Sequence, residues 1–156
     1  MSAVIETFVL KSPVLQLERR DLNLKDPTLL NPANANPLIM GEFLEFSSTA
    51  GATKQAIRAS GSYLCWAFFA EKGRSDTQAL GKAPVLYMGH YEADTLIFKA
   101  TGLTHACKLM VDDVTYGGKT LSGLAIHGGG ADEVVGRVIR LPANNGSKLR
   151  FMQLMV

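Results

Sequence analysis

The stretch that decides the fold is KLMVDDVTYGGKTLSGLAIHG, Lys108 to Gly128. Two short apolar runs, KLMVDDVTY and TLSGLAIHG, stand on either side of Gly117-Gly118. Paired glycines favour a tight turn, and runs of this length and composition are typical of strands. The stretch therefore predicts two β-strands joined by a turn.

The same texture extends over most of the chain from Leu38 onward. Short apolar runs of five to nine residues alternate with Gly, Asn and Pro, and Asn145-Gly146 predicts a further hairpin turn. AGATKQAIRA, residues 50–59, is the best helical candidate, and it is small enough to predict a loop or one short helix. Several short strands at this spacing predict a mainly β, single-domain antiparallel β-sandwich or barrel.

The chain has 156 residues, which fits one domain, and it divides at about Leu38. Residues 1–37 contain Pro27, Pro32 and Pro37, which cannot continue a helix or a ladder of paired strands. We expect residues 1–37 to form an extended N-terminal arm and residues 38–156 to form the β-rich domain. The arm could dock on another protein or fold back on its own domain.

Composition limits the function classes. Hydrophobic residues make up 47% of the chain and charged residues 19%, with a formal net charge of +2 and basic residues spread along the sequence. This pattern does not favour nucleic acid or a membrane as partner, and no apolar run reaches the roughly 18 residues that span a bilayer. No signal peptide is visible, so we expect synthesis in the cytoplasm. Cys65 and Cys107 lie in apolar runs and are expected to be buried free thiols.

The sequence HGGG, His127 to Gly130, could form the oxyanion-hole loop of a hydrolase. Such a loop needs a G-x-S-x-G nucleophile elbow, which the sequence lacks, so a turn between strands is the better interpretation. His90, His105 and His127 lack the spacing of metal ligands. Asp112 and Asp113 are adjacent on a predicted strand and should point to opposite faces. We therefore expect no catalytic residue, no cofactor and no metal.

Two segments carry a resemblance to a known group of proteins. They are FFAEKGRSDTQALGKAPVLYMGHYEADTLIF, Phe68 to Phe98, and GRVIRLPANNGSKLRF, Gly136 to Phe151. Their order and spacing resemble those of capsid decoration, or cement, proteins of tailed bacteriophages. The resemblance covers roughly Leu38 to the C-terminus and implies a β-rich protein on the outer surface of the head. It implies the major capsid protein as partner, bridging of its subunits against DNA pressure, and a homo-oligomer, a dimer or trimer.

Two regions are candidate contacts with the capsid or with a sister subunit. The first lies in the arm, which could instead fold back on its own domain. The second is the loop AEKGRSDTQALGK, which could instead be a solvated surface loop. The candidate residues are Leu29, Leu30, Pro32, Lys72, Arg74, Asp76 and Lys82. The alternatives are a tail or baseplate adaptor of the virion, a small hydrolase that uses His127, and a nucleic-acid-binding β-barrel.

Overall fold

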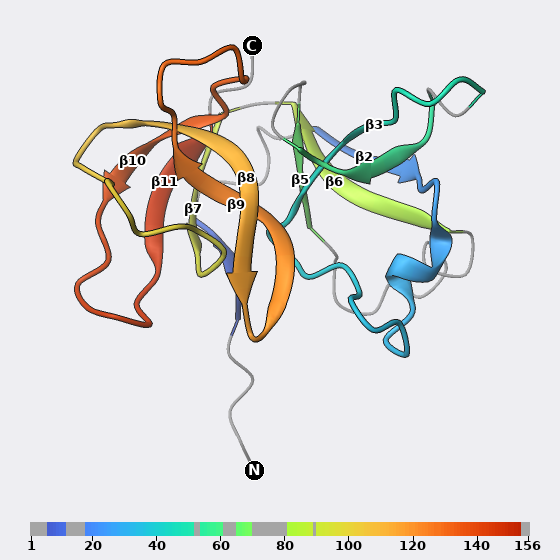
Figure 1. The fold of residues 1–156 in the computed structure, drawn as a ribbon, viewed down its shortest axis with the longest axis horizontal. Helices are drawn as coiled ribbons and strands as arrows, with labels where there is room; N and C mark the ends of the chain where they lie inside the picture. The colour runs from blue at the N-terminus through green and yellow to red at the C-terminus, as the bar shows by residue number, and fades with distance from the viewer. Residues whose placement is uncertain are drawn as a thin grey trace.

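The computed structural model describes residues 6–11, 18–51, 54–60, 65–69, 81–88 and 90–153. Strands dominate these residues, and the helical structure among them is one 3-10 helix, η2, at Pro27–Leu30 (Figure 1). No helix in this part of the chain is long and apolar enough to cross a membrane. The strands are β1 (Phe8–Leu10), β2 (Glu18–Asn23), β3 (Phe43–Phe46), β4 (Ala56–Arg58), β5 (Trp66–Phe68), β6 (Lys82–Met88), β7 (Tyr91–Thr95), β8 (Lys108–Tyr116), β9 (Lys119–Ile126), β10 (Gly136–Arg140) and β11 (Leu149–Gln153).

These strands form two sheets that lie beside each other in Figure 1. The six-stranded sheet has the order β1-β7-β11-β10-β8-β9, and the five-stranded sheet has the order β2-β6-β5-β3-β4. Neighbouring strands within both sheets pair antiparallel. The prediction of a mainly β, antiparallel fold is confirmed.

The hairpin predicted from residues 108–128 is present. Tyr116 pairs with Lys119 across the turn, and β8 and β9 stay in register from there to the pair of Leu109 with Ile126. The predicted Asn145-Gly146 turn lies in the loop between β10 and β11, which are also antiparallel partners. Both turn predictions are confirmed.

Each sheet is curved, so that a strand at one edge contacts a segment from near the opposite edge: β9 contacts the residues after β7, and β4 contacts the residues after β2. In the six-stranded sheet, the Leu124 N–H of β9 donates to the Ile97 carbonyl at 3.0 Å, and the Lys99 N–H donates to the Leu124 carbonyl at 2.8 Å. In the five-stranded sheet, the Lys25 N–H donates to the Ala56 carbonyl of β4 at 3.0 Å. Both sheets are therefore partly closed, by parallel bridges that follow β7 and β2.

The five-stranded sheet is buried on both faces. One face carries Phe43 and Leu86, which share an apolar cluster with residues of the six-stranded sheet. The other face carries Leu44, Trp66 and Phe68, which form a second cluster. Trp66 and Phe68 are each 4% exposed, so both side chains belong to the core.

The N-terminal segment contributes to both sheets. β1 pairs with β7, and β2 pairs with β6 along its whole length. Leu22, Leu24 and Leu30 are buried in the second apolar cluster. The described residues of the segment predicted as an arm therefore lie within the fold. Packing of these leucines against the five-stranded sheet removes apolar surface from water, which favours the docked position.

The prediction for residues 50–59 was wrong in part. Ala56–Arg58 forms strand β4, with Glu45 and Ile57 as register partners, and not a loop or helix. Ala56 is fully buried, so packing against the second cluster outweighs the weak helical pattern of this stretch.

Candidate functional site

The HGGG segment forms a turn between β9 and β10, as predicted. The Gly129 N–H donates to Nδ1 of His127 at 3.1 Å, and His127 Nε2 lies 2.8 Å from the Asp132 carbonyl, to which it donates. Gly129 has φ = +87°, a conformation that favours glycine. Both ring nitrogens of His127 thus stabilise the loop, and the imidazole acts here as a structural link.

Asp112 and Asp113, the adjacent acids of β8, lie on opposite faces of the strand. Lys99 Nζ donates to Asp112 at 2.7 Å, and this hydrogen bond holds the pKa of the Asp112 carboxyl below its usual range. Asp113 is exposed and lies on the other face of the strand. Among the described residues, no group of three or more His, Cys, Asp or Glu side chains lies close enough to share a metal ion.

Both cysteines are free thiols, which confirms that prediction. The predicted burial is confirmed for Cys65 and is wrong for Cys107, which is half-buried because it lies in the loop just before β8.

The candidate contact residues of the N-terminal segment lie around η2. Leu30 is buried and Leu29 is half-buried, while Pro32 is exposed. Leu30 and Pro32 line a hollow of about 430 Å³. Asp26 holds the first turn of η2, since its carboxylate accepts from the Thr28 N–H at 3.1 Å.

The second candidate region is only partly described. Lys72, Arg74 and Asp76 lie outside the described residues. Lys82 begins β6, where it pairs with Asn23 of β2 and is half-buried. The structure therefore places Lys82 in the sheet next to the N-terminal segment.

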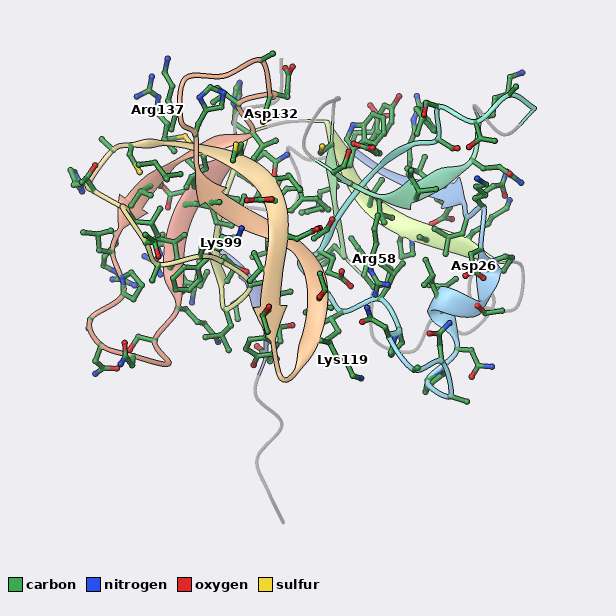
Figure 2. All side chains as sticks on the ribbon, viewed as in Figure 1. Asp26, Arg58, Lys99, Lys119, Asp132 and Arg137 are labelled. Carbon is green, nitrogen blue, oxygen red and sulfur yellow. The ribbon has the colours of Figure 1, made fainter. Side chains whose placement is uncertain are left out.

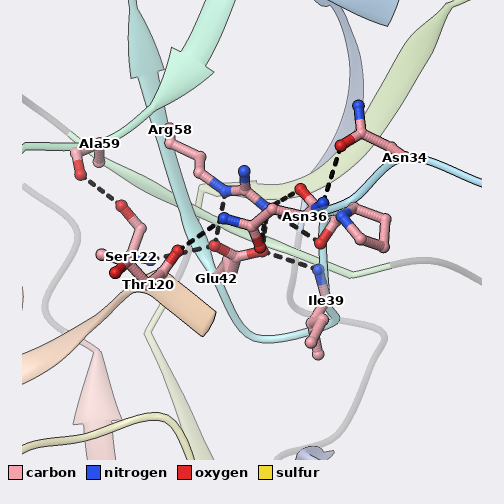
Figure 3. A network of polar contacts seen from close by, with 9 residues as sticks. Asn34, Asn36, Ile39, Glu42, Arg58, Ala59, Thr120 and Ser122 are labelled. Carbon is pink, nitrogen blue, oxygen red and sulfur yellow. Dashed lines mark hydrogen bonds and ion pairs between the residues drawn. The ribbon is translucent and has the colours of Figure 1, made fainter. Parts of the chain in front are cut away.

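A buried ionic network, which we call the Glu42 clasp, joins the two sheets (Figure 3). The Glu42 carboxylate is fully buried and accepts from Arg58 Nε at 2.8 Å and Arg58 Nη2 at 3.2 Å. It also accepts from the Ile39 N–H at 2.8 Å and the Ser122 N–H at 3.0 Å. Glu42 precedes β3 and Ser122 lies in β9, so one carboxylate connects the five-stranded sheet to the six-stranded sheet.

The clasp extends along the outer edge of β9. Asn36 Nδ2 donates to the Thr120 carbonyl at 2.9 Å, and the Ser122 hydroxyl donates to the Ala59 carbonyl. Arg58 Nη2 also donates to the Asn36 carbonyl at 2.8 Å. An open strand edge is a template for aggregation, and these bonds cover this one.

A surface groove lies beside the loop that joins β10 and β11. It measures about 490 Å³, and its larger apolar lining residues are Leu96, Phe98, Leu103, Tyr116, Leu141 and Pro142. Leu141 is 40% exposed, which makes it one of two large apolar side chains of the described chain with such exposure. Within the loop, the Ser147 hydroxyl donates to Asn144 Oδ1 at 2.6 Å, which braces the groove wall.

Sequence reasoning missed both the clasp and the groove. The signal for the clasp was Glu42 and Glu45 within the apolar run LIMGEFLEF, since buried glutamates require partners. The signal for the groove was Leu141-Pro142 at the end of a strand, one residue before the turn-forming Asn144-Asn145-Gly146.

Comparison of the chain with protein-family models, with curated proteins and with solved structures gives no match.

Proposed function

We propose that this chain is a capsid decoration protein of a tailed bacteriophage, bound to the outer surface of the head. In this role it bridges neighbouring major capsid protein subunits as a dimer or trimer and stabilises the shell against the pressure of packaged DNA. The proposal rests on the resemblance of residues 68–98 and 136–151 to such proteins. It involves no catalytic residue, cofactor, nucleic acid or membrane.

The observation that carries the proposal is the position of the second resembling segment. Its central part, Leu141–Ser147, forms a loop at the surface beside the apolar groove. Residues that serve only the core would be covered, whereas Leu141 is exposed. An exposed apolar side chain beside a groove favours contact with another protein.

The finer architecture belongs to the same proposal. We propose a single domain in which the two partly closed sheets pack as a sandwich, because Phe43 and Leu86 share one apolar cluster with Leu109 and Phe151. The Glu42 clasp supports this arrangement, since it ties β9 to the segment before β3. η2, with Pro32 at its exposed side, is the part of the N-terminal segment proposed to contact the shell.

The copy number of the chain in purified virions tests this function. Quantitative mass spectrometry against the major capsid protein should give hundreds of copies per particle, in fixed ratio to the shell protein. A handful of copies would indicate a tail or baseplate adaptor instead. Absence from the virion would refute any structural role in the particle.

A further inference from the structure

The outer face of the six-stranded sheet is basic. Strand register places Arg137 of β10 directly opposite Lys108 of β8, and Arg140 of β10 directly opposite Arg150 of β11. The neighbouring core-facing positions, such as Val138 and Phe151, are buried, so the cations lie on the other face. The cations of this face, which we call the basic face, are Lys11, Lys108, Arg137, Arg140, Lys148 and Arg150.

Only part of this charge is balanced within the chain. Asp94 of β7 lies opposite Arg150 and accepts from its guanidinium at 2.8 and 3.1 Å, with Lys11 at 3.9 Å. Within the part of the chain that the structure describes, Lys108, Arg140 and Lys148 have no ion-pair partner. Glu92 of β7, the register partner of Met152, is a second carboxylate on this face. The six cations outnumber Asp94 and Glu92, so the face keeps a net positive charge.

The register brings like charges together, which disfavours folding. Like charges directly opposite on neighbouring strands are destabilising, and Arg137 with Lys108 is such a pair. Between Arg140 and Arg150, Asp94 offsets part of the repulsion. Carboxylates of a partner placed between these cations would remove the repulsion. The arrangement thus favours a bound state with an acidic partner over the free protein.

The basic face continues into the apolar groove. Leu141, Gly146 and Ser147 line both the groove and a second hollow of about 500 Å³. That second hollow is also lined by Arg140, Lys148 and Asp94, whose carboxylate is bound to Arg150. A partner seated across the loop would contact apolar side chains on one side and cations on the other.

We propose that this combined surface binds a protein segment in which carboxylates flank an apolar side chain. The apolar side chain would occupy the groove beside Leu141, and the carboxylates would contact Arg137, Arg140 and Lys148. A protein partner fits better than nucleic acid, because a phosphate backbone has no apolar group to fill the groove. Arginine and methionine are also enriched in protein interfaces, and Met152 lies beside Arg137 on this face. The inference rests on the proposed function in one respect: if the chain decorates a capsid, this face is the one turned toward the shell.

The test uses the full chain and one matched pair of variants. Arg137→Glu with Arg140→Glu reverses two charges of the basic face. Lys119→Glu, at the exposed start of β9, reverses one charge far from Arg137 (Figure 2). Thermal unfolding checks that each variant is folded. If the double reversal does not fold, Arg140→Gln with Lys148→Gln replaces it, since neither side chain has an ion-pair partner among the described residues.

The first probe is a short fluorescein-labelled peptide in which glutamates flank a Leu-Phe pair, compared with a labelled DNA duplex. We expect the wild type to bind the peptide, the double variant to bind it about tenfold or more weakly, and Lys119→Glu to stay within about twofold. Added salt should weaken peptide binding by the wild type more than by the double variant. Equal binding by the double variant, or preference for the duplex at the same salt, would overturn the proposal.

The second probe is the purified phage shell without this chain, which separates the two proposals. Loss of shell binding by the double variant alone supports both. Equal shell binding by wild type and double variant overturns the docking face and leaves the decoration role intact. If the wild type does not bind shells but recognises the peptide through Arg137 and Arg140, the decoration role fails and the docking face stands.

Discussion

Replacement of Glu42 by glutamine should lower the free energy of unfolding by about 3 kcal/mol. Each oxygen of the Glu42 carboxylate accepts two hydrogen bonds, one pair from Arg58 Nε and the Ser122 N–H, the other from Arg58 Nη2 and the Ile39 N–H. Glutamine has one carbonyl oxygen, so its amide nitrogen must face one of these pairs of donors. Two donors then lose their acceptor.

The size of the effect follows from the burial of those donors. Leaving a buried donor without an acceptor costs about 1–3 kcal/mol. The Ser122 backbone is buried, whereas the Arg58 side chain is 22% exposed and can recover part of its bonding from water. Two unequal losses of this kind give about 3 kcal/mol, within the range seen when one partner of a buried ion pair is removed.

Urea unfolding measures this difference. Trp66 is the sole tryptophan and lies buried in the five-stranded sheet, so its fluorescence reports on that sheet, while far-UV circular dichroism reports on both. Glu45→Gln is the matched control: Glu45 is also buried, but it accepts from Ser60 at 3.2 Å and its Oε2 has no partner among the described residues. The control should change stability by less than about 1 kcal/mol. If Glu42→Gln and the control lower the free energy of unfolding equally, the Glu42 clasp does not stabilise the contact between the two sheets.

Three further outcomes test other parts of the fold. Gly123→Ala should lower the free energy of unfolding by about 3 kcal/mol, because a Cβ there would stand 2.6 Å from the Ile97 carbonyl oxygen; a loss below about 1 kcal/mol in the same titration would contradict the closure of the six-stranded sheet. The Arg150 hydrogen bond lowers the pKa of Asp94, so its stabilisation is complete above the unfolded-state pKa of about 3.9 and is lost as pH falls through the folded-state value. The stability gap between wild type and Asp94→Asn should therefore narrow below about pH 4 in urea titrations, and a constant gap would refute this account. Deletion of residues 1–37 should abolish cooperative thermal unfolding, since that segment supplies β1, β2 and buried leucines; a truncated chain that still unfolds cooperatively would show an independent arm.

The local elements of the fold could be predicted because their signals are local. The Gly117-Gly118 turn and the apolar runs from Leu38 onward correspond to strands and hairpins of the structure. The role of HGGG as a turn also followed from the missing nucleophile motif. In each case, residues within a short window determine the backbone conformation.

The tertiary contacts between strands and between sheets could not be predicted, because they join residues far apart in the sequence. Glu42 meets Ser122 only after both sheets have formed, and the parallel bridge of Leu24 with Ala56 requires the five-stranded sheet to bend. The basic face has the same origin. Lys108 and Arg137 look dispersed in sequence, and strand register makes them neighbours.

The β8–β9 hairpin shows why even a correct strand prediction leaves its function open. Val111 and Val114 are both buried although they point to opposite faces of β8. Val111 packs in the cluster between the sheets, whereas Val114 packs with Ile97 and Leu121 on the other side of the hairpin. This second contact exists because the segment after β7 crosses the hairpin at Gly123, where no side chain blocks it. Alternation along one strand cannot reveal such a crossing. The groove that Phe98 and Leu141 line depends on this closure of the six-stranded sheet. A strand prediction for either segment alone does not reveal it.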